Sequence, residues 1–388
     1  MSTERSGERS LAIMYEGPGG YVWVKQLEHG GQRGALLYFA NPDPRKLHAV
    51  DVVGMQELEA GVAAIEAAAA ELSFCVIHGA YDPVHAGADI TQFAGDCDYA
   101  AIKEHLDRGT ALDVRFKALW PKLRTVAILC GDRYGGSVEW PLFAQWAVCD
   151  DKTRLQFSEV HLGIVPGWNG ILNVMLKSSA DNGLYMGQTG NAVDAHDLQR
   201  IGLVQSLSAT PDPPDRRSTP PEQWPGLWAA HAGQCQHMLL EAALDLATAE
   251  AEPSRGDAPR LVSAEEHEEE LRRRTDPEPY RALQAEIAQQ ASALGAEPSK
   301  DDLKALIRTV NKRLGELGKP LAPEAVRKLA DYAARWGAKP YDQLLAGFAE
   351  AAQEEADLCD ELMHTDHRRI GINAILSRKP EERVPVFD

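Results

Sequence analysis

Short apolar runs alternate with helix-forming stretches in the first half of the chain, and this alternation limits the possible folds more than any other feature. Residues 35–40, 73–79 and 124–130 are apolar runs of strand length. The segments between and after them, many rich in Ala, Leu and Glu, are typical of helices, and we expect helices over 51–72, about 99–119, and from Gly135-Gly136 to about Cys149. This order of elements favours parallel strands joined by β-α-β crossovers.

The alternation stops near residue 207. Six prolines lie within residues 210–226 and exclude a regular helix or a central strand there. Beyond them the pattern predicts helices only, including a charged, solvent-facing one, over 228–249, 264–274, 278–293, 300–317 and 323–363. The sequence therefore predicts an α/β first part and an α-rich second part, and we expect residues 1–10 to be disordered.

Charge and cysteine usage narrow the classes of partner. The chain of 388 residues has a formal net charge of -18, which argues against nucleic acid or an anionic membrane as the main partner. Its six cysteines form no Cys-x-x-Cys pair, as expected in a reducing compartment and not in a zinc site. Neither a signal peptide nor a membrane-spanning run is evident. We therefore expect a cytoplasmic protein without a bound metal.

Three segments at the ends of predicted strands combine small residues with polar ones. They are His85-Ala86-Gly87-Ala88-Asp89-Ile90, Tyr134-Gly135-Gly136-Ser137-Val138-Glu139, and the run from Phe157 to Gly167, FSEVHLGIVPG. Loops at strand ends often hold functional groups on a rigid scaffold. Each segment alone has a plain structural interpretation, as a turn, a close backbone packing or a helix-terminal charge.

In this order and spacing the three segments resemble the crotonase (enoyl-CoA hydratase/isomerase) superfamily. Residues 183–207, GLYMGQTGNAVDAHDLQRIGLVQSL, resemble a further family segment of the type leTGxxisAxeAxxxGLVxxv. Ile375-Leu376-Ser377-Arg378-Lys379-Pro380 resembles the family's C-terminal fleKRkPxF tail. The resemblance implies an α/β, crotonase-like fold of repeated β-β-α units followed by an α-rich C-terminal region. The scaffold hosts several reactions, so the resemblance alone does not identify one.

The resemblance also implies an active site. By position in the motifs, the backbone N–H groups of Ala88 and Gly136 would form an oxyanion hole for the enolate of a thioester. Glu139 and Glu159 fall on the two catalytic glutamate positions of the family's hydratases. Two carboxyls around one apolar site can raise one of their pKa values toward neutrality.

Further residues are expected to contact the substrate. Arg45 and Lys46 follow the first predicted strand, and Arg378 and Lys379 lie near the C-terminus, where basic groups would meet the phosphates of coenzyme A. Ala86 and Asp89 belong to the first motif. Trp168 and Asn169, which replace the family's usual small residues after Pro-Gly, would lie near the acyl end. His85 is best interpreted as a histidine satisfied by nearby backbone, although a polar role in the site is an alternative.

The sequence thus predicts a crotonase-like core over 11–207, a Pro-rich linker and helical insertion over 208–320, and a family-like C-terminal helical region over 321–388. The leading hypothesis is an enoyl-CoA hydratase-like lyase whose substrate carries coenzyme A, with no other cofactor. Open alternatives are a thioester or ring-opening hydrolase, an enoyl-CoA isomerase, or a non-catalytic CoA-binding paralogue. The resemblance further implies a homo-oligomer, a trimer or hexamer. For the insertion, a lid or an oligomer-contact arm remain open.

Overall fold

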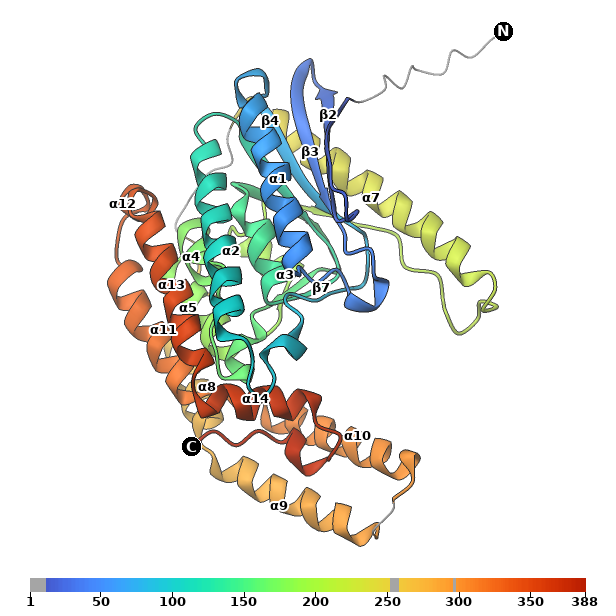
Figure 1. The fold of residues 1–388 in the computed structure, drawn as a ribbon, viewed down its shortest axis with the longest axis vertical. Helices are drawn as coiled ribbons and strands as arrows, with labels where there is room; N and C mark the ends of the chain where they lie inside the picture. Colours follow the sequence, from blue (N-terminus) through green and yellow to red (C-terminus); the bar gives the residue numbers. More distant parts are fainter. Residues whose placement is uncertain (1–11, 252–257, 296–297) are drawn as a thin grey trace.

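A large, mostly parallel sheet forms the centre of the first half of the chain (Figure 1). The computed structural model describes residues 12–251, 258–295 and 298–388, and the predicted disordered segment 1–10 lies outside them. In the described part the sheet has seven strands, in the order β1 (Ile13–Glu16), β2 (Val22–His29), β3 (Gln32–Phe39), β4 (Phe74–Gly79), β6 (Arg124–Leu129), β8 (Trp146–Asp150) and β11 (Ser206–Ser208). The strands from β3 to β11 pair in parallel, whereas β1, β2 and β3 form an antiparallel edge.

A second, smaller sheet receives the strand that follows each central strand. Its described strands run in the order β10 (Val193–Asp194), β9 (Arg154–Gln156), β7 (Asp132–Tyr134) and β5 (Val84–His85). Each unit therefore places one strand in each sheet and continues into a helix: β4 and β5 lead to α2 (Tyr99–Leu119), β6 and β7 to α3 (Gly136–Glu139), and β8 and β9 to α4 (Gly170–Lys177). These are the repeated β-β-α units that the sequence predicts.

Both faces of the large sheet are buried, which explains why its strands are continuous apolar runs. On β4, Cys75 and Ile77 point into the main core, beside α1 (Val52–Ala68) and α2. Phe74 and Val76 alternate with them and face α7 (Trp224–Thr248) on the opposite side. The first helix of the predicted insertion therefore covers one face of the sheet instead of forming a separate unit.

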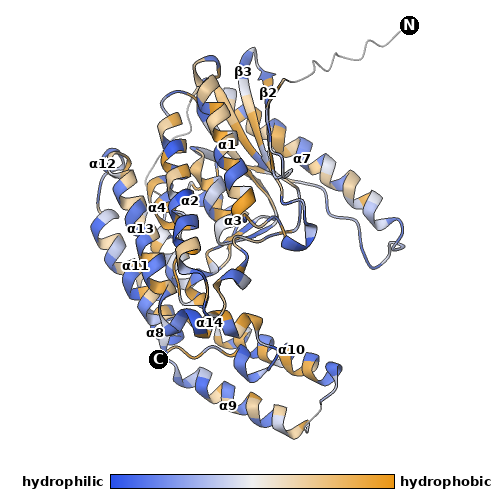
Figure 2. Cartoon of the chain, viewed as in Figure 1, coloured by the Kyte–Doolittle hydropathy of each residue, from blue (hydrophilic) through white to orange (hydrophobic). Residues whose placement is uncertain are grey.

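The remaining described helices surround the lower part of the sheet and its loops (Figure 1). α11 (Pro323–Trp336) packs on α5 (Ala180–Thr189), and α13 (Phe348–Met363) packs on α2. α9 (Glu278–Ala293) and α10 (Lys300–Leu317) form a pair with its own small apolar cluster, which includes Val384 of the C-terminal tail. α6, α8, α12 and α14 span Ala195–Arg200, Ala264–Thr275, Tyr341–Ala346 and Asp366–Leu376. In Figure 2 the strands are mostly orange, whereas the outer helices mix blue and orange, as expected for helices with one exposed side.

The predicted fold class is confirmed, and two details of the element predictions are wrong. The helix expected from Gly135-Gly136 to about Cys149 ends at Glu139, a short 3-10 turn follows, and residues 146–150 form strand β8. Pro141 lacks a backbone N–H, and the apolar segment after it gains a full set of partners between β6 and β11. The helix expected over 323–363 is interrupted around Pro340 and divides into three. No helix of the described residues is apolar over a length sufficient to cross a membrane.

Candidate active site

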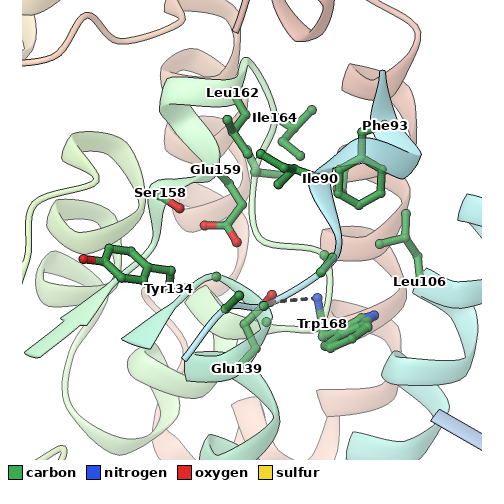
Figure 3. Close-up of a pocket in the computed structure, with 18 of the residues that line it drawn as sticks. Ile90, Phe93, Leu106, Tyr134, Glu139, Ser158, Glu159, Leu162, Ile164 and Trp168 are labelled. Carbon is green, nitrogen blue, oxygen red and sulfur yellow. Dashed lines mark hydrogen bonds between the residues drawn. The ribbon is translucent and has the colours of Figure 1, made fainter. Parts of the chain in front are cut away.

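A cavity of about 380 Å³ lies where the loops after β5, β7 and β9 meet the helices of the second half (Figure 3). Three groups of residues line it. Backbone from the first two motifs forms one side, and the carboxyls of Glu139 and Glu159 lie along another. The rest of the wall is mainly apolar, with Leu47, Ile90, Phe93, Ile102, Leu106, Leu162, Ile164, Val165, Trp168, Cys359 and Ile375. A concave apolar site with few polar groups is typical of a ligand pocket.

The first two motifs touch each other at their glycines. A Cβ on Gly87 would overlap the backbone nitrogen of Gly136, so only glycine permits this approach. Neither the Ala88 N–H nor the Gly136 N–H donates a hydrogen bond to any residue that the structure describes. Two such donors at one end of an apolar cavity can bind an oxygen that carries negative charge.

Glu139 ends the short helix α3 and is almost fully buried. Its Oε1 accepts hydrogen bonds from the backbone N–H groups of Trp168, at 2.8 Å, and Gly170, at 3.1 Å. Burial raises the pKa of Glu139 from 4.5 to about 7, against the opposing effect of these two donors. A carboxyl with this pKa can exchange a proton near neutral pH.

Glu159 lies on the 3-10 turn Ser158–Leu162 and has a different environment. Its Oε2 is buried without a hydrogen-bond partner among the described residues. Its Oε1 lies over Gly135, whose φ of 53° and lack of a Cβ leave space for it. Burial first, then the charge of Glu139, raise the pKa of Glu159 well above its usual value. In Figure 3 the Glu159 carboxyl points toward Glu139. The Glu159 carboxyl therefore loses its proton less readily than a carboxyl in water does.

Trp168 and Asn169 follow each other in sequence but point in different directions. The Trp168 ring lines the cavity next to Gly136, and its Nε1 donates to the backbone oxygen of His105 at 3.2 Å. Asn169 adopts a left-handed conformation, with φ of 66°, and its Nδ2 donates to Asp113 at 3.2 Å. The predicted position of Asn169 at the acyl end is therefore wrong, because its backbone conformation turns the side chain into a buried polar cluster.

Of the other residues predicted to contact substrate, some line the cavity or lie next to it and others do not. Ala86 lines the cavity, and Asp89 caps the following 3-10 turn through Thr91. Lys46 is next to the cavity residue Leu47, and its Nζ lies 3.6 Å from the Asp51 Oδ2 and 3.9 Å from the Asp89 Oδ2. The exposed Arg45 instead pairs with Asp43, with 2.7 Å between Nη2 and Oδ2. Neither Arg378 nor Lys379 is among the described residues that line the cavity, and Lys379 pairs with Glu382 at 2.7 Å. His85 is buried, with Nε2 3.1 Å from the Asp82 backbone oxygen, as its plain interpretation predicts.

The sequence analysis missed what the second half contributes. Cys359 and Ile375 line the cavity. Glu355, with no measurable exposure, lies one helical turn before Cys359 and hydrogen-bonds the backbone of α4. One signal was available: Glu355 falls on the apolar face of its helix, in register with Ala351 and Cys359, where a charged residue is unusual.

Comparisons with known proteins bear on the family and the fold of the chain. The family model described as Enoyl-CoA hydratase/isomerase matches residues 37–214. A fatty acid oxidation complex subunit alpha from Psychrobacter sp. (strain PRwf-1) is 32% identical over 130 residues, which are 33% of this chain and only 18% of that relative.

Solved structures show the same fold over most of the chain. A carnitinyl-CoA dehydratase from Mycobacterium thermoresistibile superimposes with a TM-score of 0.53 at 16% identity, over 92% of this chain and 90% of that one. An enoyl-CoA hydratase from Rhodobacter sphaeroides 2.4.1 gives 0.51 at 16% identity, over 93% and 91%. At this identity the likeness concerns the fold alone.

Proposed function

Because the chain belongs to the crotonase superfamily, we propose that it is an acyl-CoA-processing enzyme that adds water to the double bond of an enoyl-CoA thioester. One observation carries this proposal: two buried carboxyls, of Glu139 and Glu159, share an apolar cavity with the free backbone N–H groups of Ala88 and Gly136. A carbonyl oxygen, a water molecule and a proton each have a matching group there.

The two N–H groups act on the thioester oxygen. When the oxygen of water bonds to the β-carbon, the π electrons move through the α-carbon to the carbonyl, and an enolate forms. Ala88 and Gly136 donate to this oxygen, where the charge develops. The Trp168 ring beside Gly136 limits how the thioester can lie and keeps bulk water from the oxygen.

The two carboxyls divide the proton transfers between them. Glu139, with two backbone donors on one oxygen, is the more easily ionised and takes a proton from the attacking water. Glu159, protonated at the start, gives its proton to the α-carbon and completes the addition. The proton then passes from Glu139 back to Glu159, directly or through water, and the site is restored for the next turnover.

The CoA part would leave the cavity between the loop of Lys46 and Leu47 and the end of α14. Lys46 precedes the cavity residue Leu47, and Ile375 near the end of α14 also lines the cavity. The apolar wall, from Ile90 to Cys359, fits a hydrocarbon acyl group.

Product masses test the proposal. Purified protein is incubated with crotonyl-CoA, a cyclic enoyl-CoA and a saturated acyl-CoA, and the products are resolved by mass spectrometry. Water addition yields an acyl-CoA heavier by one water, with CoA still attached. Release of free CoA would identify a hydrolase, and an unchanged mass with a shifted double bond would identify an isomerase. Either of these results in place of the hydrated thioester rejects the proposed reaction.

A further inference from the structure

The first turn of α4 binds carboxyls that come from two distant parts of the chain. Trp168 and Gly170 donate their N–H groups to Glu139 of α3. The next two N–H groups, of Ile171 and Leu172, donate to Oε1 and Oε2 of Glu355, each at 2.9 Å. The donors that a helix leaves unpaired at its start are thus shared between a glutamate of the cavity and a glutamate of the second half.

The helix that carries Glu355 also packs directly on this turn. Cys359, one helical turn after Glu355, lies so close to Gly167 that a Cβ there would be 3.1 Å from the sulfur. A third carboxyl, of Asp113 on α2, accepts from Asn169 at 3.2 Å and from Asn173 at 2.7 Å. Residues 167–173 are therefore held from several sides, and α13 contacts both ends of the turn that holds Glu139.

We propose that Glu355 is a positioning residue of the active site: by holding the first turn of α4, it keeps the N–H groups of Trp168 and Gly170 directed at Glu139. This inference rests on the proposed function, since it assigns Glu355 a role in proton transfer by Glu139. Glu355 does not line the cavity and touches no substrate. It acts through the backbone turn.

The electrostatic setting agrees with this role. Burial, and then the charge of Glu139, raise the pKa of Glu355 to about 8, against the opposing effect of its N–H donors and of Tyr332. Four further titratable groups lie in this region. Besides burial, the charge of Asp113 raises the pKa of Glu139, and the charges of Glu139 and Glu355 raise that of Glu159. Tyr332 of α11 lies at Glu355, and the Cys359 thiol belongs to α13. Because Glu139 and Glu355 carry the same charge, ionisation of one makes ionisation of the other less favourable.

A matched control exists elsewhere in the chain. Glu57 of α1 is also a buried glutamate, and its carboxyl also accepts backbone N–H groups, from Gly19, Tyr21 and Val22. It lies outside the cavity lining. Glu57→Gln therefore removes a similar buried carboxylate without touching α4.

The experiment compares Glu355→Gln, Glu355→Asp and Glu57→Gln with the unaltered protein. For Glu355→Gln we expect a loss of kcat of about 10- to 100-fold, as for a displaced reacting group, with little change in KM. The acidic limb of the pH profile of kcat/KM should move to higher pH, because a loosened turn directs its N–H groups less well at Glu139 and stabilises the Glu139 carboxylate less. Glu355→Asp keeps a carboxyl that is too short to reach the turn, so it should change kcat and the limb in the same direction. Glu57→Gln should lower only the melting temperature.

Two results would overturn the inference. One is normal kcat and an unmoved pH profile in Glu355→Gln. The other is a loss of kcat that Glu57→Gln shows equally. Hydrogen–deuterium exchange over residues 164–176 provides a readout that needs no turnover: exchange should rise in Glu355→Gln and Glu355→Asp and stay normal in Glu57→Gln. If the unaltered protein hydrates no thioester, the proposed function fails, and unchanged exchange in the Glu355 variants would separately reject the positioning role.

Discussion

The two halves of the molecule contribute to the same cavity by different means. In the α/β half, the groups that we propose to react follow directly from strand ends: Ala88 comes after β5, Gly136 after β7 and Glu159 after β9. In the helical half, residues reach the cavity from the sides of helices, as Cys359 does from α13 and Ile375 from α14.

The two halves differ in the chemical groups that they bring to the cavity. Backbone N–H groups and carboxyls face the cavity from the first half, whereas the second half supplies apolar wall and supports loops from behind. Arg368 of α14 illustrates this support, since its guanidinium donates to the backbone oxygens of Phe93 and Gly95 at 2.7 and 2.9 Å and to the Tyr99 hydroxyl at 2.7 Å. The comparison teaches that the reactive groups are local to short motifs, while their alignment depends on contacts made hundreds of residues later.

The largest effect should come from the carboxyls of the first half. Glu139→Gln and Glu159→Gln should each lower turnover by about 10²–10⁴-fold, the usual contribution of a general acid or base. Affinity for the substrate should change much less, because the amide keeps the shape and neither residue holds the CoA. The double variant should lose far less than the product of the two, since both groups serve one reaction. Steady-state kinetics on the identified thioester measures this, and near-normal turnover in either single variant would contradict the two-carboxyl mechanism.

Removal of a support from the second half should instead affect stability. Arg368→Met removes the donor from the backbone oxygens of Met363, Phe93 and Gly95 and should lower the free energy of unfolding by on the order of 1–3 kcal/mol. The neighbouring Arg369 has an exposed side chain and pairs with Asp366, so Arg369→Met is a matched control with little expected effect. Urea denaturation of both variants makes the comparison, and equal stabilities would show that α14 does not support the Phe93 loop.

Much of the first half was predictable because its signals are local. The runs at 73–79 and 124–130 form β4 and β6, since strands buried on both faces need continuous apolar sequence. The small residues of the first two motifs allow the close approach of Gly87 and Gly136. Glu139 and Glu159 could be named from the motifs, and the fold brings both to the cavity.

The rest depends on long-range contacts that no local pattern records. Apolar periodicity cannot tell a buried strand from a buried helix over 146–150. These residues form a strand because they pair with β6 on one side and β11 on the other. The direction of Asn169 depends on its left-handed backbone and on Asp113, 56 residues earlier. Glu355 binds a turn 183 and 184 residues away from it. Antiparallel β1 and β2 were missed because their apolar runs, at 11–15 and 21–24, are short and are followed by polar residues.

Ligand binding should show whether the two halves form one unit. An acyl-CoA at about 100 times its Kd should stabilise the fold by about 2.7 kcal/mol through mass action, whereas the free acid should have little effect. Because residues of both halves line the cavity, calorimetry should show a single transition that shifts as a whole. Two transitions, of which only one shifts, would mean that the halves unfold separately. No shift with either CoA or acyl-CoA would remove support for a CoA-dependent function.

The smallest expected effect is the change in the free energy of unfolding with pH. It allows one carboxyl from each half to be compared. The folded-state pKa values of Glu139, about 7, and Glu355, about 8, lie above the ordinary value of 4.5. The folded protein therefore binds more protons than the unfolded chain from about pH 4.5 upward, and stability falls as the pH rises through these values. Buried histidines act in the opposite sense, since burial lowers the pKa of His78 and His105 to about 4 and that of His161 to about 3. Their contribution grows as the pH rises toward the ordinary value of 6.5 and levels off about one pH unit above it.

Between about pH 6.5 and 8 the two carboxyls together should lower the free energy of unfolding by on the order of 1–2 kcal/mol, and the last part of the histidine titration offsets some of this decrease. Glu355→Gln removes one of the titrating groups, so the stability of this variant should depend on pH less steeply there. Glu139→Gln should have a similar effect, because each variant leaves one carboxyl of the pair. Glu57→Gln should keep the slope of the unaltered protein, as it leaves this pair intact. Urea titrations at four pH values from 6.5 to 8 measure the slopes. If Glu139→Gln flattens the slope and Glu355→Gln leaves it unchanged, only the carboxyl of the first half titrates in this range. The two halves would then differ in the one property that they are predicted to share.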